Sequence, residues 1–280
     1  MSTPCDPTAL LPHWTPPALR LPLLNDVRHQ LRMAARGVES TVIEGTKGAG
    51  KTHAVRRALV EWEAEEAARE DFDPLRESCA CGLWLDASDA QGSKTALLDL
   101  HTTLVGRGGT RMRQVYTPLD FIRVCAHELQ QRNIRVLVVD EAQKINASNM
   151  DQLRQVIDLT QQHAHPFGIL FVGTPPLRRT LAATGELGQR ISGMITVARL
   201  ELTDIETHLE SLHPHLSLVR AELGTVGWRQ LAQEVHQCSR GSLRRLVRIV
   251  EKAHALSLHA QQPITHDFVQ LAMNRMAPEE

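Results

Sequence analysis

The stretch Ile43–Leu59, IEGTKGAGKTHAVRRAL, places three glycines just before a lysine and a threonine. A valine and isoleucine run precedes the glycines and an apolar-periodic segment follows them, so the expected order is strand, loop and helix. The centre of the stretch fits the pattern GxxxxGK[ST] in full, which is typical of a loop that surrounds phosphate oxygens. The residues of this loop are Gly45, Thr46, Lys47, Gly48, Ala49, Gly50, Lys51 and Thr52.

The residue types in this loop have physical reasons. Glycine lets the chain turn so that consecutive main-chain N–H groups face inward, and the helix that begins near Lys51 adds the positive end of its dipole. We expect Lys51 to contact the β- and γ-phosphates of ATP and the Thr52 hydroxyl to bind Mg²⁺. A mere turn is the alternative, and the order of strand, loop and helix argues against it.

A second element, Ile134–Gln143 (IRVLVVDEAQ), is an apolar strand that ends on two acids. Ligands of open α/β sheets bind outside the carboxyl ends of the strands. We therefore expect Asp140 to hold Mg²⁺, directly or through water, and Glu141 to polarise a water for attack on the γ-phosphate. Two solvated acids at a strand end are the alternative. A second acid beside the magnesium ligand favours hydrolysis over phosphoryl transfer to a small molecule.

Strands and helices alternate along most of the chain, which predicts βαβ crossovers and a doubly wound parallel sheet. The expected strands are Thr41–Glu44, Gly82–Ala87, Ile134–Val139, Gly168–Gly173 and Val197–Leu200. One helix, 23–36, is expected before the first strand. The helices expected between the strands are Lys51–Ala68, Ser93–Leu104, Leu119–Gln131 and Asn149–Gln162. After Leu202 only helical patterns remain, at Asp204–Ser211, Trp228–Gln237, Ser242–Leu258 and Thr265–Asn274. We predict a proline-rich arm over residues 1–22, a nucleotide-binding α/β domain over 23–202 and a helical domain over 203–280.

Composition narrows the class of protein. Hydrophobic residues make up 42% and charged residues 22% of the 280 residues, as in globular proteins. The net charge is −1, so any contact with a polyanion must come from a local patch. The five scattered cysteines favour reduced thiols in the cytoplasm. Cys79 and Cys81 could be half of a zinc site, but no second pair lies at ligand spacing. No apolar run approaches the ~20 residues of a membrane span, so we expect no membrane partner.

The motifs GTKGAGKT, VLVVDEAQ and LFVGT, in this order, resemble those of AAA+ ATPases over roughly residues 23–275. The motifs VDEAQ and FVGTPPL resemble those of TniB/TnsC-type transposition ATPases, which are relatives of the phage Mu B protein. Similar motifs also occur in ATPases of bacterial secretion and of replication initiation. The resemblance implies a P-loop NTPase (AAA+) fold of the α/β class, with a small C-terminal helical lid domain and with ATP and Mg²⁺ as cofactors.

The resemblance also implies roles for single residues. Thr174, after the strand ILFVG, stands at the position of sensor 1, where the family often has asparagine. Arg190 in ELGQRIS stands where an arginine finger would reach the ATP of a neighbouring subunit. Arg244 in SRGSLRRLVRIV matches sensor 2, at the start of a lid helix. Arg178 and Arg179 are alternative candidates for the arginine finger, and Arg245 is an alternative candidate for sensor 2. At each of these positions the arginine could instead belong to a solvated basic surface.

Residues 92–117 form the candidate DNA-binding segment, because they are basic and rich in glycine. Its cations are Lys94, Arg107, Arg111 and Arg113. Contacts of such cations go to phosphates, so they are tolerant of sequence and sensitive to salt. An ordinary solvated loop is the alternative.

By resemblance, we expect a homo-oligomer, either a ring or a helical filament, that forms on double-stranded DNA when ATP is bound. It would recruit or activate a DDE transposase, with a target-selection protein as a further partner. The alternative is an AAA+/STAND-like ATPase switch that acts on protein partners in secretion, signalling or replication initiation.

Overall fold

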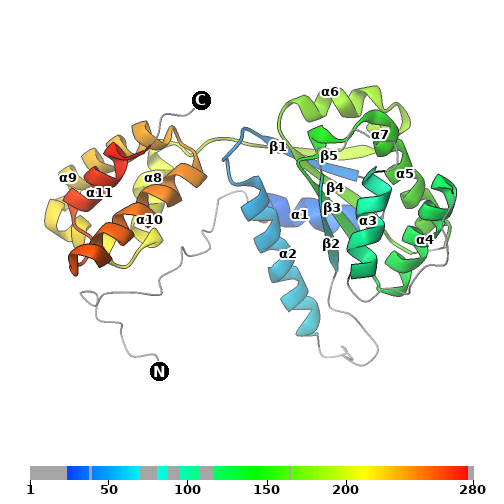
Figure 1. Ribbon diagram of the computed structural model, residues 1–280, viewed down its shortest axis with the longest axis horizontal. Coiled ribbons are helices and arrows are strands. Elements are labelled where there is room, and N and C mark those ends of the chain that lie inside the picture. Colours follow the sequence, from blue (N-terminus) through cyan, green and yellow to red (C-terminus); the bar gives the residue numbers. More distant parts are fainter. Residues whose placement is uncertain are drawn as a thin grey trace. The chain divides into compact units, whose positions relative to one another are not determined.

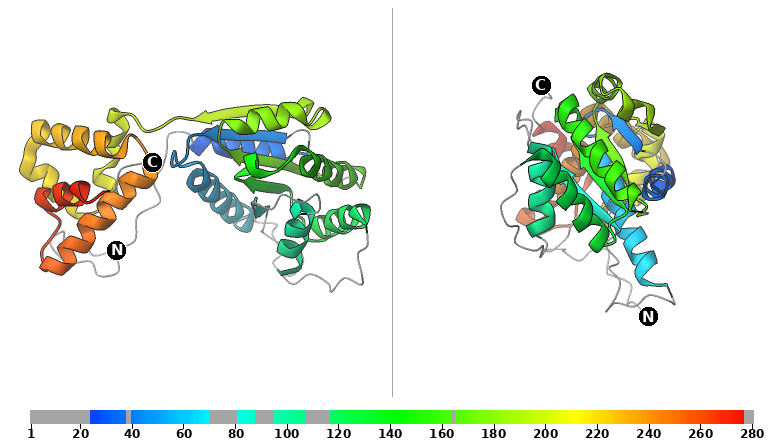
Figure 2. Two further views of the ribbon diagram at one scale, coloured as in Figure 1. Left: turned by 45° about the horizontal axis from the view of Figure 1, so that its top comes forward. Right: turned by 90° about the vertical axis from the view of Figure 1, so that its right-hand side faces the viewer.

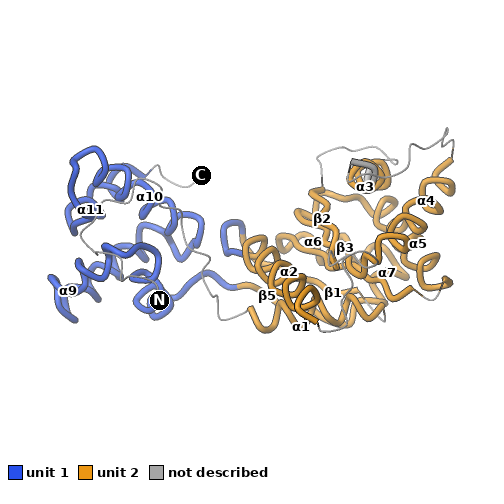
Figure 3. The backbone as a smooth tube through the Cα atoms, turned by 90° about the horizontal axis from the view of Figure 1, so that it is seen from below, with its two compact units in different colours: residues 1–20, 47–50, 198–280 blue, residues 21–46, 51–197 orange. Residues whose placement is uncertain are grey.

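The computed structural model describes residues 24–37, 40–69, 81–87, 95–106, 117–163 and 165–276. Contacts among these residues separate two compact units, coloured in Figure 3. We call residues 24–46 and 51–197 the sheet unit, and residues 47–50 and 198–276 the helical unit. The domain boundaries predicted at residues 22 and 202 stay predictions.

Within the described residues, one sheet of five parallel strands forms the centre of the sheet unit, in the order β2-β3-β4-β1-β5. The strands are β1 (Ser40–Gly45), β2 (Gly82–Asp86), β3 (Val136–Asp140), β4 (Gly168–Gly173) and β5 (Ile191–Val197). The predicted doubly wound parallel sheet is confirmed. Because β4 lies between β1 and β3, the residues that follow β4 are placed between the loop after β1 and the acids after β3.

The burial of each strand explains whether it could be predicted from the sequence. Every residue of β1, β3 and β4 is buried, as expected for central strands covered on both faces. β5 is an edge strand in which half-buried and exposed residues alternate up to Val197. The expected strand Val197–Leu200 is wrong: the last strand ends where that one was predicted to begin. The alternating pattern of an edge strand is weaker than a continuous apolar run, which is why β5 was missed.

Helices cover both faces of the sheet (Figures 1 and 2). On one face lie α1 (Leu24–Ala35) and α2 (Lys51–Ala67), and on the other lie α3 (Thr95–Gly106), α4 (Pro118–Gln131) and α5 (Ala147–Gln162). Side chains of the second face, such as Val42, Leu137 and Phe171, join these three helices in one apolar core. Two short helices, α6 (Pro176–Ala183) and α7 (Glu186–Gln189), contribute to the same core and were not predicted.

The helical unit contains α8 (Leu202–His208), η2 (Glu210–Leu212), α9 (His215–Ser239), α10 (Leu243–Ala260) and α11 (His266–Asn274). Gly224 interrupts α9 with a φ of 64° and a ψ of −177°. The Ser242 side chain caps α10 by accepting from the main-chain N–H of Arg245. Among the residues that the structure describes, no helix combines the length and apolarity that a membrane crossing requires.

Candidate nucleotide site

The loop between β1 and α2 has the backbone of a tight, glycine-dependent turn. Gly48 and Gly50 have φ angles of 81° and 98°, which residues with a Cβ atom rarely adopt. Lys51 begins α2 and is only 8% exposed. Its ammonium group donates to the main-chain carbonyls of Gly45 at 2.7 Å and Thr46 at 3.0 Å. The lysine is therefore held against the loop that the sequence pattern predicts to bind phosphate.

Asp140, at the end of β3, lies at the same edge of the sheet as Thr52. The Thr52 hydroxyl donates to Asp140 Oδ2 over 2.9 Å, and the main-chain N–H of Glu141 donates to Asp140 Oδ1 over 2.9 Å. Burial raises the pKa of the Asp140 carboxyl, and the two hydrogen bonds oppose this shift. Two oxygen ligands in contact, one of them a carboxylate, suit Mg²⁺, which takes few protein ligands and completes its shell with phosphates and water.

Glu141 has an unusual backbone. Its φ and ψ of 52° and 34° lie in the left-handed region, which is uncommon for a residue with a side chain and often marks a functional position. It precedes a short 3₁₀ helix, η1 (Ala142–Lys144). Because the backbone turns at Glu141, this residue does not continue the direction of β3, which ends at Asp140. The two neighbouring acids therefore have different surroundings.

Gln143 on η1 links Glu141 to the end of β4. Its Nε2 donates to Glu141 Oε2 over 2.7 Å, and its Oε1 accepts from the main-chain N–H of Thr174 over 3.1 Å. The structure thus places Glu141 and Thr174, two predicted site residues, on either side of one amide. The sequence pattern did not indicate Gln143, because the contact crosses between strands whose order in the sheet a sequence does not state.

Arg190 lies at the opposite edge of the sheet from the loop. It ends α7 directly before β5, and its main-chain carbonyl accepts from the N–H of Ser40 at the start of β1 over 2.9 Å. From Ser40 to Gly45 a strand covers about 16 Å. The Arg190 side chain is 42% exposed and pairs with Asp158 of α5. Arg190 is therefore remote from the loop within this chain.

Arg178, an alternative candidate for the arginine finger, forms an ion pair and a hydrogen bond within its own sheet unit. Its guanidinium pairs with Glu44 Oε1 at 2.5 Å and donates to the Thr196 hydroxyl at 3.3 Å. Glu44 is 4% exposed and stands on β1 immediately before the loop. Arg178, like Arg190, thus pairs with a carboxylate of its own chain, and the second alternative, Arg179, is exposed on α6.

The remaining predicted residues are distributed as follows. Arg244 is exposed in the first turn of α10, in the helical unit, and its role toward a nucleotide stays a prediction. The predicted DNA-binding residues Lys94, Arg107, Arg111 and Arg113 lie outside the described residues. In the described part of the chain, no cluster of three or more histidine, cysteine or acidic side chains could hold a metal ion.

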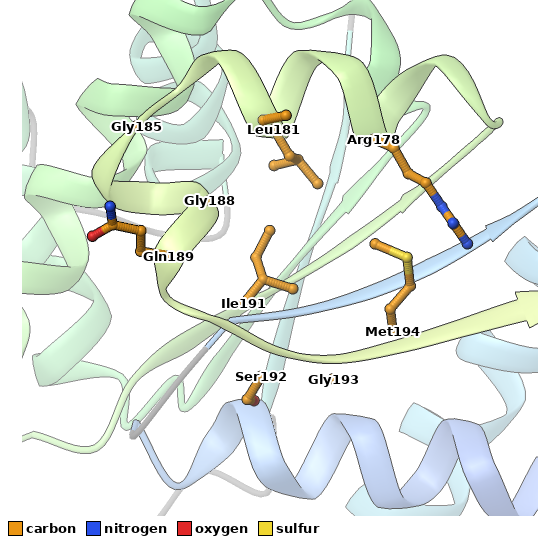
Figure 4. A pocket seen from close by; sticks show the side chains of 10 residues that line it. Arg178, Leu181, Gly185, Gly188, Gln189, Ile191, Ser192, Gly193 and Met194 are labelled. Carbon is orange, nitrogen blue, oxygen red and sulfur yellow. The ribbon is translucent and has the colours of Figure 1, made fainter.

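A hollow of about 600 Å³ lies beside β5, between this strand and α6 and α7 (Figure 4). Leu181, Ile191 and Met194 point into it, and Gly185 and Gly188 leave room along its side. None of its lining residues belongs to the loop, the acidic pair or Thr174. This hollow is therefore separate from the predicted phosphate site at the carboxyl edge of the sheet.

Comparison with known proteins agrees with this geometry. The sequence profile of the AAA domain family matches residues 35–181, more than half of the chain. The chain belongs to the AAA domain family. The matched part of this AAA domain includes the loop, the acidic pair and Thr174. The general prediction of an AAA+ ATPase is thus confirmed, and the TniB/TnsC type stays a prediction. No curated protein matches the chain.

Solved structures share the fold of this AAA+ chain. The ORC2 protein of Aeropyrum pernix, in its ADPNP–ADP complexes, has a TM-score of 0.67 at 18% identity, over 97% of this chain and 72% of that one. Cdc6p of Pyrobaculum aerophilum has a TM-score of 0.61 at 16% identity, over 94% and 69%. The ORC1 protein of Aeropyrum pernix in complex with DNA has a TM-score of 0.59 at 15% identity, over 95% and 68%.

Proposed function

We propose that this AAA+ chain binds ATP with Mg²⁺ and hydrolyses it at the carboxyl edge of its sheet. The observation that carries the proposal is the 2.9 Å hydrogen bond between Thr52 and Asp140. It joins the phosphate-binding loop and the acidic strand end in one oxygen-lined site beside Glu141. Nucleotides in the similar ORC2 structure support a nucleotide as ligand.

Each residue of the site has a distinct role in this proposal. Lys51 and the main-chain N–H groups of the loop bind the phosphates, while Thr52 and Asp140 would hold Mg²⁺, which neutralises phosphate charge when bound. Glu141 orients the attacking water and accepts its proton. Thr174, Arg190 and Arg244 complete the proposed set as sensor 1, arginine finger and sensor 2.

The variant Glu141→Gln tests the hydrolytic step. It should keep ATP affinity in calorimetry and lose about 100-fold or more of phosphate release, because general acid–base catalysis contributes ~10²- to 10⁴-fold. Glu251→Gln, which changes an exposed carboxylate on α10, is the control and should turn over like the wild type. Unchanged turnover in Glu141→Gln would show that another group is the base. A wild-type chain that ignores magnesium and ATP would remove the whole proposal.

We further propose that the ATP-bound chain assembles as a ring or filament on double-stranded DNA and serves transposition by recruiting or activating a DDE transposase. This proposal is supported by the motifs VDEAQ and FVGTPPL, which resemble those of TniB/TnsC-type ATPases, and by the basic segment 92–117. The structural likeness to an ORC1 protein in complex with DNA is consistent with DNA as partner. A cytoplasmic location and a target-selection partner belong to the same proposal.

Fluorescence anisotropy on random duplex tests the DNA partner. Binding should require ATP or a slowly hydrolysed analogue and should weaken with salt. Replacing Lys94, Arg107, Arg111 and Arg113 by alanine should lower the slope of log K against log salt by about 0.9 for each phosphate contact removed. The charge-matched control replaces Arg220, Arg229, Arg248 and Lys252, which are exposed on the helical unit. Equal loss in both variants would contradict the assigned segment.

The alternative is an ATPase switch that acts on protein partners in secretion, signalling or replication initiation. The net charge of −1 favours it, because the chain as a whole does not attract DNA. An absence of ATP-dependent duplex binding at low salt, in a chain that hydrolyses ATP, would replace the transposition proposal by this alternative.

A further inference from the structure

Gln143 makes two hydrogen bonds that divide its amide between two parts of the site. The NH₂ group donates to one oxygen of the Glu141 carboxylate, and the carbonyl oxygen accepts from the main-chain N–H of Thr174. An amide is the side-chain group that offers a donor and an acceptor in one plane. Both bonds are well within normal length, at 2.7 and 3.1 Å.

Two features of the backbone near Gln143, one at Gly173 and one at Glu141, permit this arrangement. A Cβ atom at Gly173 would lie 2.6 Å from Gln143 Oε1, so the glycine at the end of β4 permits the amide to approach the strand. On the other side, the left-handed backbone of Glu141 begins the 3₁₀ turn that carries Gln143. Such a backbone is strained and persists only where its surroundings hold it.

We infer that Gln143 is a positioning residue for ATP hydrolysis, which holds the Glu141 carboxylate and ties it to the main chain at Thr174. Because Oε2 of Glu141 accepts from the amide, the carboxylate cannot rotate freely, and Oε1 is left to accept a proton from water. The same amide holds the end of β4, so a displacement of Thr174 is transmitted to the base. The inference rests on the proposed ATPase function and adds a residue to it.

The first test separates positioning from nucleotide binding. Gln143→Met keeps the length of the side chain but removes both hydrogen bonds, and it should lower kcat about 10- to 100-fold, since misplacement by about 1 Å can cost 10²-fold. Its affinity for ATP and its thermal midpoint should remain near those of the wild type. The matched control is Gln155→Met on α5, where a glutamine amide donates to the Asp151 carboxylate over 3.0 Å outside the site. It should keep the wild-type kcat.

A double-mutant cycle shows whether Gln143 acts through Glu141. If it does, Glu141→Gln combined with Gln143→Met should have the same residual turnover as Glu141→Gln alone, because groups that act as a unit are not additive. Losses that multiply would overturn the inference, as would a Gln143→Met chain with the wild-type kcat. Loss of ATP affinity in Gln143→Met would also overturn it, by showing a structural role.

The proposed function fails separately. A wild-type chain that shows no turnover, with or without duplex DNA, removes the ATPase proposal and the inference with it. A wild-type chain that hydrolyses ATP while Gln143→Met behaves like Gln155→Met overturns the inference alone.

Discussion

At the scale of single residues, Lys51 is the cation on which the phosphate loop depends. Lys51 is 8% exposed, and its ammonium group donates to the main-chain carbonyls of Gly45 and Thr46. These bonds hold the cation against the loop, where it can strengthen the binding of an anion.

Replacing Lys51 by alanine should abolish detectable binding of ATP, because the positive charge and its donors are removed from the loop. Isothermal calorimetry with MgATP measures the effect, and Lys144→Ala, which changes an exposed lysine on η1, should bind like the wild type. The far-UV circular dichroism of both variants should be unchanged. Retained affinity in Lys51→Ala would contradict the role assigned to the loop.

The acidic pair and the loop could be predicted from the sequence, because each motif is continuous and ends a recognisable strand. Gln143 could not, since its partner Thr174 lies 31 residues away in the sequence, directly after the neighbouring strand β4. The ion pair between Arg178 and Glu44 could not be predicted either, because it joins residues of α6 and β1 that lie far apart in the sequence. The sequence favoured Arg190 as the finger and left Arg178 and Arg179 as alternatives.

At the scale of elements, the helical unit contains a buried chain of three histidines. The His213 ring accepts at Nδ1 from the main-chain N–H of His215, and its Nε2 lies 3.1 Å from His254 Nδ1. The His215 ring accepts at Nδ1 from the N–H of Ile264. Because Nδ1 of His213 is an acceptor, the neutral ring carries its proton on Nε2 and donates to His254. The three rings thus connect the start of α9, α10 and the segment before α11.

Acid should destabilise this helical unit. Burial, followed by the neighbouring His215 and His254, lowers the pKa of His213 to about 3, whereas an unfolded histidine titrates near 6.5. The native ring therefore stays neutral while the unfolded ring takes up a proton. The contribution of neutral His213 to the free energy of unfolding is fully present above about pH 6.5. It is lost as the pH falls toward 3, by up to about 1.4 kcal/mol per pH unit for one proton.

Urea unfolding followed by circular dichroism from pH 7 to pH 4 measures this slope. His213→Gln should be less stable at pH 7, because it loses hydrogen bonds, but its stability should depend on pH with about one proton less than the wild type. His259→Gln, at an exposed position of α10, should keep the wild-type slope. An unaltered slope in His213→Gln would show that other groups cause the acid sensitivity.

Element boundaries show what the sequence pattern could and could not reveal. The β3 and β4 strands were found because they are nearly continuous apolar runs, and β1 was found because the β-branched run TVI precedes the glycine-rich loop. The α6 helix was missed because Pro175 and Pro176 suggest a loop, although proline is well tolerated in the first turn of a helix. The first half of α9 was missed because Gly224 interrupts its periodicity. In both cases a proline or glycine that usually indicates a break in a helix stands within or at the start of a helical segment.

At the scale of the whole molecule, the position of Arg190 requires a second subunit if this residue is to act on ATP. It lies at the start of β5, while the loop and the acids lie at the opposite, carboxyl edge of the sheet. Its pairing with Asp158, which also pairs with Arg154, holds it at an exposed surface of the sheet unit. The site of one subunit is therefore incomplete in this proposal until a neighbour supplies its arginine.

Mixing two inactive variants tests this arrangement. Arg190→Ala subunits keep the loop and lack the arginine, and Lys51→Ala subunits keep the arginine and lack ATP binding. A mixture should release phosphate faster than the sum of the two separate variants, because each Arg190→Ala site can receive Arg190 from a Lys51→Ala neighbour. Arg179→Ala, a substitution of an exposed arginine on α6, replaces Arg190→Ala in the matched control mixture. If turnover in the Arg190→Ala mixture equals the sum at concentrations where the wild type is oligomeric, Arg190 does not act in trans.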